Sequence, residues 1–190
     1  MAEQIESLKF RCPDIVALQE VTLPILNSYP PLLSSIGLHH IVASFHLSRE
    51  KDELKGPRRY GEIIASRWRL SPMKPEFFPV PWKERVLSAK VITPMGNIEL
   101  HTTHIPPGSS NGWIKIEMLE GIYKRLARQT KIPRILCGDF NAPQEERPSG
   151  EVLTWAQRIS ARGDVQYRKH RGNGGIEGKG MSFGGWQILT

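Results

Sequence analysis

Four residues of this chain have side chains suited to phosphate chemistry, and each ends or closely follows an apolar stretch typical of a β-strand. They are Glu20, His104, Asp139 and Asn141. Carboxylate oxygens are hard ligands that suit Mg²⁺. An imidazole can transfer a proton or donate a hydrogen bond to a phosphoryl oxygen. Because strand ends in α/β proteins commonly open onto the active site, we expect these side chains to share one cleft.

Each of the four also has a simpler interpretation when it is taken alone. A glutamate at a strand end is most often solvated, and a lone histidine is more often a surface or core residue than a catalytic one. Asp139 and Asn141 could cap a turn. They are two positions apart, so they would project to the same side of an extended backbone. Gly138 before them would let the chain approach a ligand closely.

The elements that must position these residues alternate between helix and strand. Periodicity and turn signals predict helices and short strands in the order helix, strand, helix, strands, helix, strand. Helices are expected at 3–11, 22–37 (interrupted near Pro30–Pro31) and 113–129; strands are expected at 14–18, 41–43, 61–66, 85–93, 97–103 and 134–137. The last helix is expected to pack its Ile116, Leu119 and Ile122 face on the sheet. Mixed strands with helices outside indicate an α/β sandwich.

Composition excludes several classes of protein. Hydrophobic residues are 39% and charged residues 24%, as in ordinary globular domains, and no apolar run is long enough to span a membrane. The N-terminus does not resemble a secretory signal, and Cys12 and Cys137 match no disulfide or zinc spacing, so a reducing cytoplasm is expected.

The net charge of +7 fits an anionic partner such as nucleic acid. More than half of that excess lies in residues 158–190, with six basic and two acidic residues, so a mildly basic surface explains it equally well.

The motifs, taken in order, resemble those of the endonuclease/exonuclease/phosphatase superfamily. The series is Pro13-Asp-Ile-Val-Ala-Leu-Gln-Glu20, Gly61-Glu-Ile-Ile-Ala-Ser-Arg67, Thr103-His104 and Cys137-Gly-Asp-Phe-Asn141. The resemblance covers about residues 5–160. It implies a four-layer sandwich of two mixed β-sheets flanked by helices, and a metal-dependent phosphodiesterase or nuclease using Mg²⁺ or Mn²⁺. DNA, RNA, phospholipid and nucleotide substrates all remain compatible with it.

The resemblance also assigns roles to the four residues. Glu20 would ligate the metal, His104 would hydrogen-bond the scissile phosphate, Asp139 would orient or deprotonate the attacking water, and Asn141 would hold the phosphate or that water. In the family, water attacks phosphorus in line with the leaving oxygen. Asn111, in the loop expected to rim the cleft, would contact phosphate.

Two features of the family are missing from the sequence. No Trp-Asn-type motif precedes Glu20, and no Ser-Asp-His motif follows Asn141. We therefore expect a partial domain over residues 1–160, incomplete at both ends, followed by an atypical glycine-rich and basic tail over 161–190. Two alternatives stay open: a non-catalytic remnant that binds phosphate or nucleic acid, and an unrelated α/β interaction module.

We predict that the tail is translated out of frame and that the 190-residue chain is inactive or nearly so. Residues 172–190 contain seven glycines and no helix or strand period, which also suits a flexible tail. A two-base shift makes the GG of each glycine codon the last two bases of a new codon, which then encodes Arg, Trp or Gly, and permitted codons yield an amphipathic continuation. Sequencing the gene around codon 172 tests this. An intact frame with no family motif in any shifted frame, or strong Mg²⁺-dependent phosphodiesterase activity of this chain, would contradict it.

Overall fold

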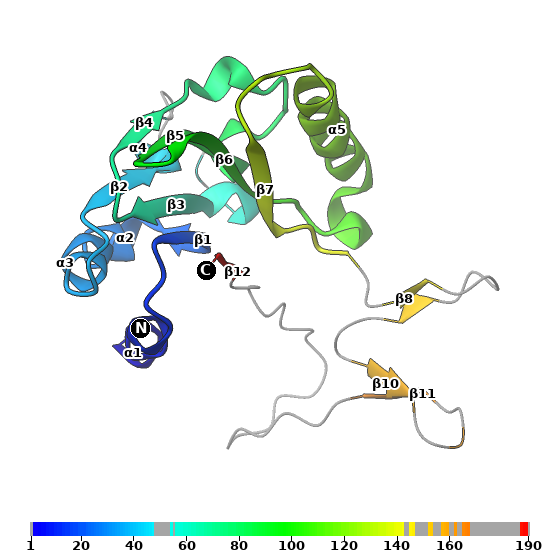
Figure 1. Ribbon diagram of the computed structural model, residues 1–190. Helices are drawn as coiled ribbons and strands as arrows, with labels where there is room; N and C mark the ends of the chain where they lie inside the picture. The colour runs from blue at the N-terminus through cyan, green and yellow to red at the C-terminus, as the bar shows by residue number, and fades with distance from the viewer. Residues whose placement is uncertain are drawn as a thin grey trace. The chain divides into compact units, whose positions relative to one another are not determined.

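Two β-sheets lie face to face with helices on their outer sides (Figure 1). This arrangement comes from a computed structural model that describes residues 2–47, 54 and 56–142. Beyond them it describes only 145–146, 152–153, 157–159, 162, 165–167 and 187–189. Among the described helices, none is long and apolar enough to cross a membrane.

The first sheet is built from β1 (Ile15–Thr22), β2 (His40–Ala43), β3 (Tyr60–Ser66) and β12 (Gln187–Leu189). Their order is β12-β1-β3-β2, and each neighbouring pair is antiparallel. The pairing of β1 with β3 shifts register between Leu18 and Val21, which makes a bulge. Glu20 lies in this bulge. The strand therefore continues through Glu20 instead of ending there as expected.

The second sheet has the order β4-β5-β6-β7. Its strands are β4 (Leu70–Pro72), β5 (Val86–Thr93), β6 (Gly96–His104) and β7 (Arg134–Asp139). β5 and β6 form the hairpin that the alternating pattern predicted. β7 runs parallel to β6, so this sheet is mixed. The parallel register places His104 beside Asp139 at the ends of the two strands.

Helices cover the outer face of each sheet, as the family resemblance implied. The helices α1 (Ala2–Arg11), α2 (Leu23–Leu26), α3 (Tyr29–Ser34) and α4 (Ser44–Leu47) share a core with the first sheet. The long helix α5 (Gly108–Leu126) packs with the second sheet. Within the described part of the chain, three short 3-10 turns lie in the connections: η2 (Gly56–Arg59), η3 (Pro75–Phe77) and η4 (Lys83–Arg85).

A separate apolar core joins the two sheets. The first sheet supplies Ile15, Ala17 and Ile64 to this core, and the second supplies residues such as Leu87 and Leu100, which are fully buried. Each such side chain contributes about 1.5–3 kcal/mol through removal of its surface from water. The order helix, sheet, sheet, helix confirms the predicted four-layer α/β architecture.

Two expectations about helices were wrong in detail. The predicted helix over 22–37 is two helices, and the break falls at Asn27–Ser28, before the prolines. Pro30 stands in the first turn of α3, where a missing amide hydrogen costs nothing. The prolines therefore begin the second helix instead of ending the first.

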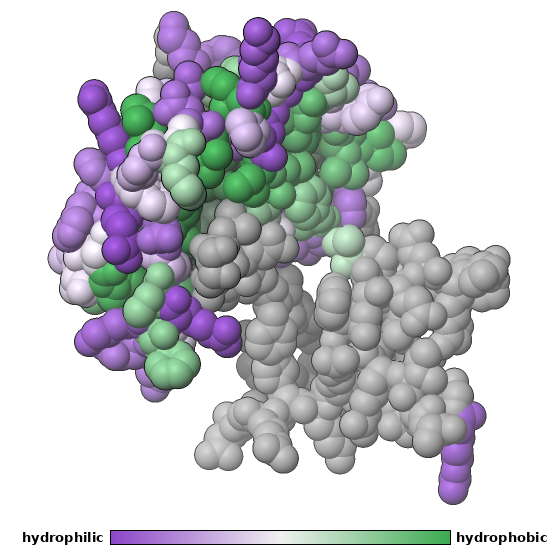
Figure 2. Space-filling view, viewed as in Figure 1, coloured by the Kyte–Doolittle hydropathy of each residue, from purple (hydrophilic) through white to green (hydrophobic). Residues whose placement is uncertain are grey.

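The buried face of α5 also differs from the expected one. Met118 and Ile122 are buried, whereas Ile116 and Leu119 are 45% and 39% exposed. The helix begins at Gly108, so the Pro-Pro-Gly segment leads directly into a helix and not into a loop. In the space-filling view, apolar side chains reach the surface over α5 (Figure 2).

A second compact unit spans Ala142–Phe183, whereas Gly184–Thr190 group with the first unit. The second unit contains two small antiparallel pairs, β8 (Glu145–Glu146) with β9 (Val152–Leu153) and β10 (Gln157–Ile159) with β11 (Val165–Tyr167). Most of the tail at 161–190 lies outside the described residues, so the expectations for it stay predictions.

Gly138 should be the glycine least tolerant of substitution. Its φ is +132°, and a Cβ there would lie 1.9 Å from the carbonyl oxygen of Thr103 in β6. Gly96 is a matched control, because its φ is +128° but a Cβ there would meet nothing within 4 Å. We expect Gly96→Ala to cost about 1–3 kcal/mol of backbone strain. Gly138→Ala should add a steric clash and lower Tm much further. Equal losses in thermal denaturation would contradict this account.

Candidate active site

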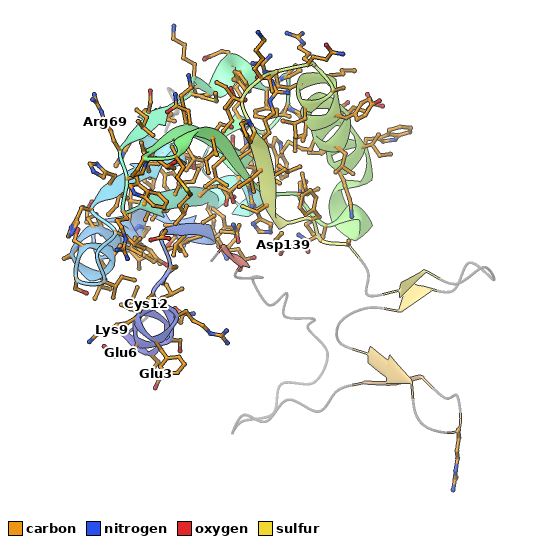
Figure 3. The ribbon with its side chains drawn as sticks, viewed as in Figure 1. Glu3, Glu6, Lys9, Cys12, Arg69 and Asp139 are labelled. Carbon is orange, nitrogen blue, oxygen red and sulfur yellow. The ribbon has the colours of Figure 1, made fainter. Side chains whose placement is uncertain are left out.

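His104 and Asp139 meet where β6 and β7 end. They are paired in the parallel register, and the backbone N–H of Ile105 donates to the Asp139 carbonyl at 2.8 Å. Figure 3 labels Asp139 at this end of β7. The His104 side chain is almost completely buried, whereas the Asp139 side chain keeps 15% of its surface exposed. The imidazole is therefore held in place, and the carboxylate keeps access to solvent.

Glu20 reaches the same point from the other sheet. Its Oε1 lies 3.7 Å from His104 Nε2, and Asp139 Oδ2 lies 3.9 Å from that same nitrogen. Glu20 has a φ of +58°, a left-handed backbone that costs a non-glycine residue roughly 1–2 kcal/mol. The bulge in β1 thus aims the carboxylate toward the end of β6. The expected convergence of Glu20 and Asp139 is confirmed, and the roles of both stay predictions.

Arg85 occupies the opposite side of the His104 ring. Its guanidinium Nη1 hydrogen-bonds His104 Nδ1, and Arg85 is only 3% exposed. Burial first, and then the Arg85 charge, lowers the pKa of His104 to about 3. The two carboxylates near Nε2 would favour a charged ring, but a protonated Nδ1 could not accept from the guanidinium. We therefore take the imidazole as neutral, with its hydrogen on Nε2.

Glu62 is a buried acid that the sequence analysis did not single out. It lies on β3, is fully buried, and both of its carboxylate oxygens lack a hydrogen-bond partner among the described residues. Burial raises its pKa well above the ordinary value; the positive Arg85 opposes this shift, whereas Asp139 and Glu20 add to it. The available signal for Glu62 was that it is a single acid inside the apolar run Gly-Glu-Ile-Ile-Ala. The sequence analysis also missed Arg85.

Asn141 sits in a tight turn directly after β7. Its backbone N–H donates to Asp139 Oδ1 at 2.8 Å, and its Nδ2 donates to the Ile105 carbonyl at 2.7 Å. Its φ is +46°, so the backbone is not extended here and the condition for Asp139 and Asn141 to project to the same side is not met. The Asp139 side chain instead accepts from the backbone two residues ahead, which fixes its orientation. Lys115 of α5 donates to the Asn141 carbonyl at 3.0 Å.

Asn111 lies in the first turns of α5 and not in a loop. Its side chain is outside the described residues, so its proposed phosphate contact stays a prediction. Tyr60, at the start of β3, borders the site. Its ring centroid lies 6.5 Å from that of His104, and the guanidinium carbon of Arg59 lies 4.7 Å from the Tyr60 ring centroid.

The donor set suits a magnesium ion held partly by water. Among the described residues, no group of three or more His, Cys, Asp or Glu side chains is arranged to hold a metal. Mg²⁺ is commonly bound by one or two carboxylates together with waters and substrate phosphate oxygens. Glu20, whose side chain is 29% exposed, and Asp139 provide two such carboxylates beside one histidine. The residues present therefore fit the ion.

The fold of this chain recurs in other proteins. The sequence profile of the endonuclease/exonuclease/phosphatase family matches residues 3–186. A solved endonuclease/exonuclease/phosphatase from Beutenbergia cavernae DSM 12333 is 21% identical, with a TM-score of 0.55 over 78% of this chain and 44% of its own. A search of curated protein sequences gave no match.

Two further solved structures are similar in fold. ANGEL2, a 2′,3′-cyclic phosphatase in complex with adenosine-2′,3′-vanadate, is 19% identical, with a TM-score of 0.51 over 75% of this chain and 44% of its own. Humanized D. rerio TDP2 is 15% identical, with a TM-score of 0.55 over 82% and 64%. This chain thus spans less than half the length of ANGEL2 and of the Beutenbergia protein.

We predict that Glu20→Gln weakens Mg²⁺ binding by about tenfold or more, since an amide oxygen replaces a charged ligand. Isothermal titration with Mg²⁺ measures this. Glu120→Gln serves as the control, because Glu120 is an exposed acid on α5 paired with Lys124. Unchanged Mg²⁺ affinity in a folded Glu20→Gln protein would refute the assignment of Glu20 as a ligand.

Proposed function

Because this chain belongs to the endonuclease/exonuclease/phosphatase family, we propose that it carries the site of a metal-dependent phosphodiester hydrolase. The family resemblance drawn from the motifs is thereby confirmed. The observation that supports the activity most directly is the meeting of Glu20, His104 and Asp139, with one imidazole nitrogen within 4 Å of both carboxylates. It is the arrangement expected for attack of water on a phosphodiester.

Each residue has a role that its surroundings support. Glu20, partly exposed at the bulge, would hold Mg²⁺ or Mn²⁺; such an ion offsets the charge that develops on phosphoryl oxygens. His104 would donate its Nε2 hydrogen to a phosphoryl oxygen. Asp139 would orient the attacking water and accept its proton through Oδ2, since Oδ1 already accepts from the backbone of Asn141. Asn141 would position the phosphate or the water.

The surroundings of the site support an anionic substrate that extends beyond one phosphate. Arg59 is exposed and lies over the Tyr60 ring, and that ring borders His104. A cation stacked on an aromatic ring can contact both a phosphate and a base. We propose nucleic acid as the preferred partner among the compatible phosphodiesters.

Hydrolysis of bis(p-nitrophenyl) phosphate tests the proposed reaction. In the protein translated from the frame shifted at codon 172, we expect turnover that needs Mg²⁺ or Mn²⁺ and stops with EDTA. Turnover there should fall roughly 10²–10⁴-fold in Asp139→Asn and roughly 10²–10³-fold in His104→Ala. Asp14→Asn is the matched control, because Asp14 is a half-exposed acid paired with Arg67 at the start of the same motif. The protein translated from the reading frame shifted at codon 172 is assayed beside the 190-residue chain.

The same assay separates the catalytic proposal from the non-catalytic alternative. Phosphate binding without turnover in either form of the chain would favour a remnant that binds phosphate or nucleic acid. Wild-type turnover in Asp139→Asn would reject the role of that residue.

A further inference from the structure

Arg85 contacts Nδ1 of His104, whereas both carboxylates lie near the other ring nitrogen, Nε2. It comes from η4, directly before β5, and its carbonyl accepts a hydrogen bond from Thr103 Oγ1 at 2.9 Å. Thr103 is the residue before His104 on β6. The backbone of Arg85 is thus tied to the strand that carries the histidine, and its guanidinium reaches His104 Nδ1.

The chemistry of a guanidinium decides which nitrogen of His104 carries the hydrogen. Arginine has five N–H donors, no acceptor, and stays protonated in proteins. His104 Nδ1 must therefore be the acceptor of this bond, and the ring hydrogen must be on Nε2. That hydrogen is on the nitrogen nearest Glu20 and Asp139, at 3.7 and 3.9 Å from their oxygens. An imidazole with its hydrogen on Nδ1 would present a lone pair there instead.

The burial of Arg85 argues against a direct role in binding substrate. Arg85 is only 3% exposed, whereas Arg59, which also lies near the Tyr60 ring, is exposed. A buried cation is costly unless nearby groups balance it. Glu62 and Glu84, both almost fully buried, oppose the effect of burial on the Arg85 pKa. Glu84 is itself held by Arg58 through two hydrogen bonds of 2.6 and 2.9 Å.

We propose that Arg85 is a positioning residue that fixes the tautomer and orientation of His104, so that Nε2–H faces the substrate phosphate. The catalytic meaning of this device rests on the proposed hydrolase function. The tautomer itself does not, since it follows from the contact between Arg85 and His104. Arg85 therefore acts on the reaction through His104 and touches no substrate atom.

Long-range ¹⁵N–¹H NMR of the imidazoles in the 190-residue chain tests the proposal. In the wild type, His104 should show a protonated nitrogen at Nε2 and an unprotonated one at Nδ1. Arg85→Met fills similar space but cannot donate, so it should shift the population toward hydrogen on Nδ1. Arg85→Lys keeps one donor and should restore the wild-type pattern at least in part.

Two controls separate positioning from general damage. His101 is fully buried in the outer core of the second sheet, with its Nδ1 2.8 Å from Ser88 Oγ, and its signals should not change. Arg134→Met removes another partly buried arginine, paired with Glu99 at 2.9 Å toward the start of β6. It should lower stability and leave the His104 tautomer unchanged. If Arg85→Met does not fold, the wild-type and Arg85→Lys spectra still decide the tautomer.

Kinetics supply an independent readout in whichever form of the chain turns over phosphodiester. Arg85→Met should lower kcat by about 10²-fold or more with a smaller change in KM, and Arg85→Lys should recover part of the loss. Hydrogen on Nδ1 in the wild type, or an unchanged His104 spectrum in folded Arg85→Met, would overturn the proposal. Absence of turnover in every form, together with the expected tautomer changes, would reject the hydrolase function and leave the positioning role supported.

Discussion

The close approach of β7 to β6 is the constraint from which the site follows. At Gly138 the strands are so near that a single Cβ would occupy the space of the Thr103 carbonyl. This contact sets the register that places His104 beside Asp139. The turn after β7 then folds back, with Asn141 donating to the carbonyl of Ile105. Backbone geometry, and not the functional side chains, therefore determines how far apart the reacting groups stand.

The charged groups around His104 polarise its imidazole ring. A guanidinium contacts Nδ1 on the buried side, and two carboxylates lie near Nε2 on the side open to solvent. A hydrogen bond received at one nitrogen draws electron density through the ring and makes the hydrogen on the other nitrogen a stronger donor. The ring stays neutral while it transmits this polarisation. A neutral donor avoids the cost of burying a second positive charge beside Arg85.

Much of this arrangement could be predicted from the sequence, because it depends on local patterns. The alternation in residues 85–93, followed by a turn, specified the β5–β6 hairpin, and the motifs ending at Glu20 and Asn141 specified which strand ends meet. Glu62 and Arg85 escaped prediction because their places near the site depend on the stacking of two sheets, which no local sequence pattern records. The face of α5 escaped for a related reason. A Cβ on Gly121 would lie 2.4 Å from the Pro79 carbonyl, so the small residue, and not the count of apolar ones, decides which side of the helix docks.

At Glu20, the stability of the fold and the proposed function favour different residues, because the backbone there is left-handed. Glycine or asparagine would adopt a φ of +58° with less strain, so either substitution should make the bulge easier to form. Neither would supply a carboxylate beside His104. A lineage selected only for a stable fold would be expected to drift toward those residues at this position, whereas one selected for catalysis would keep the strained acid. The residue at position 20 in related genes thus records which of the two pressures has acted on each.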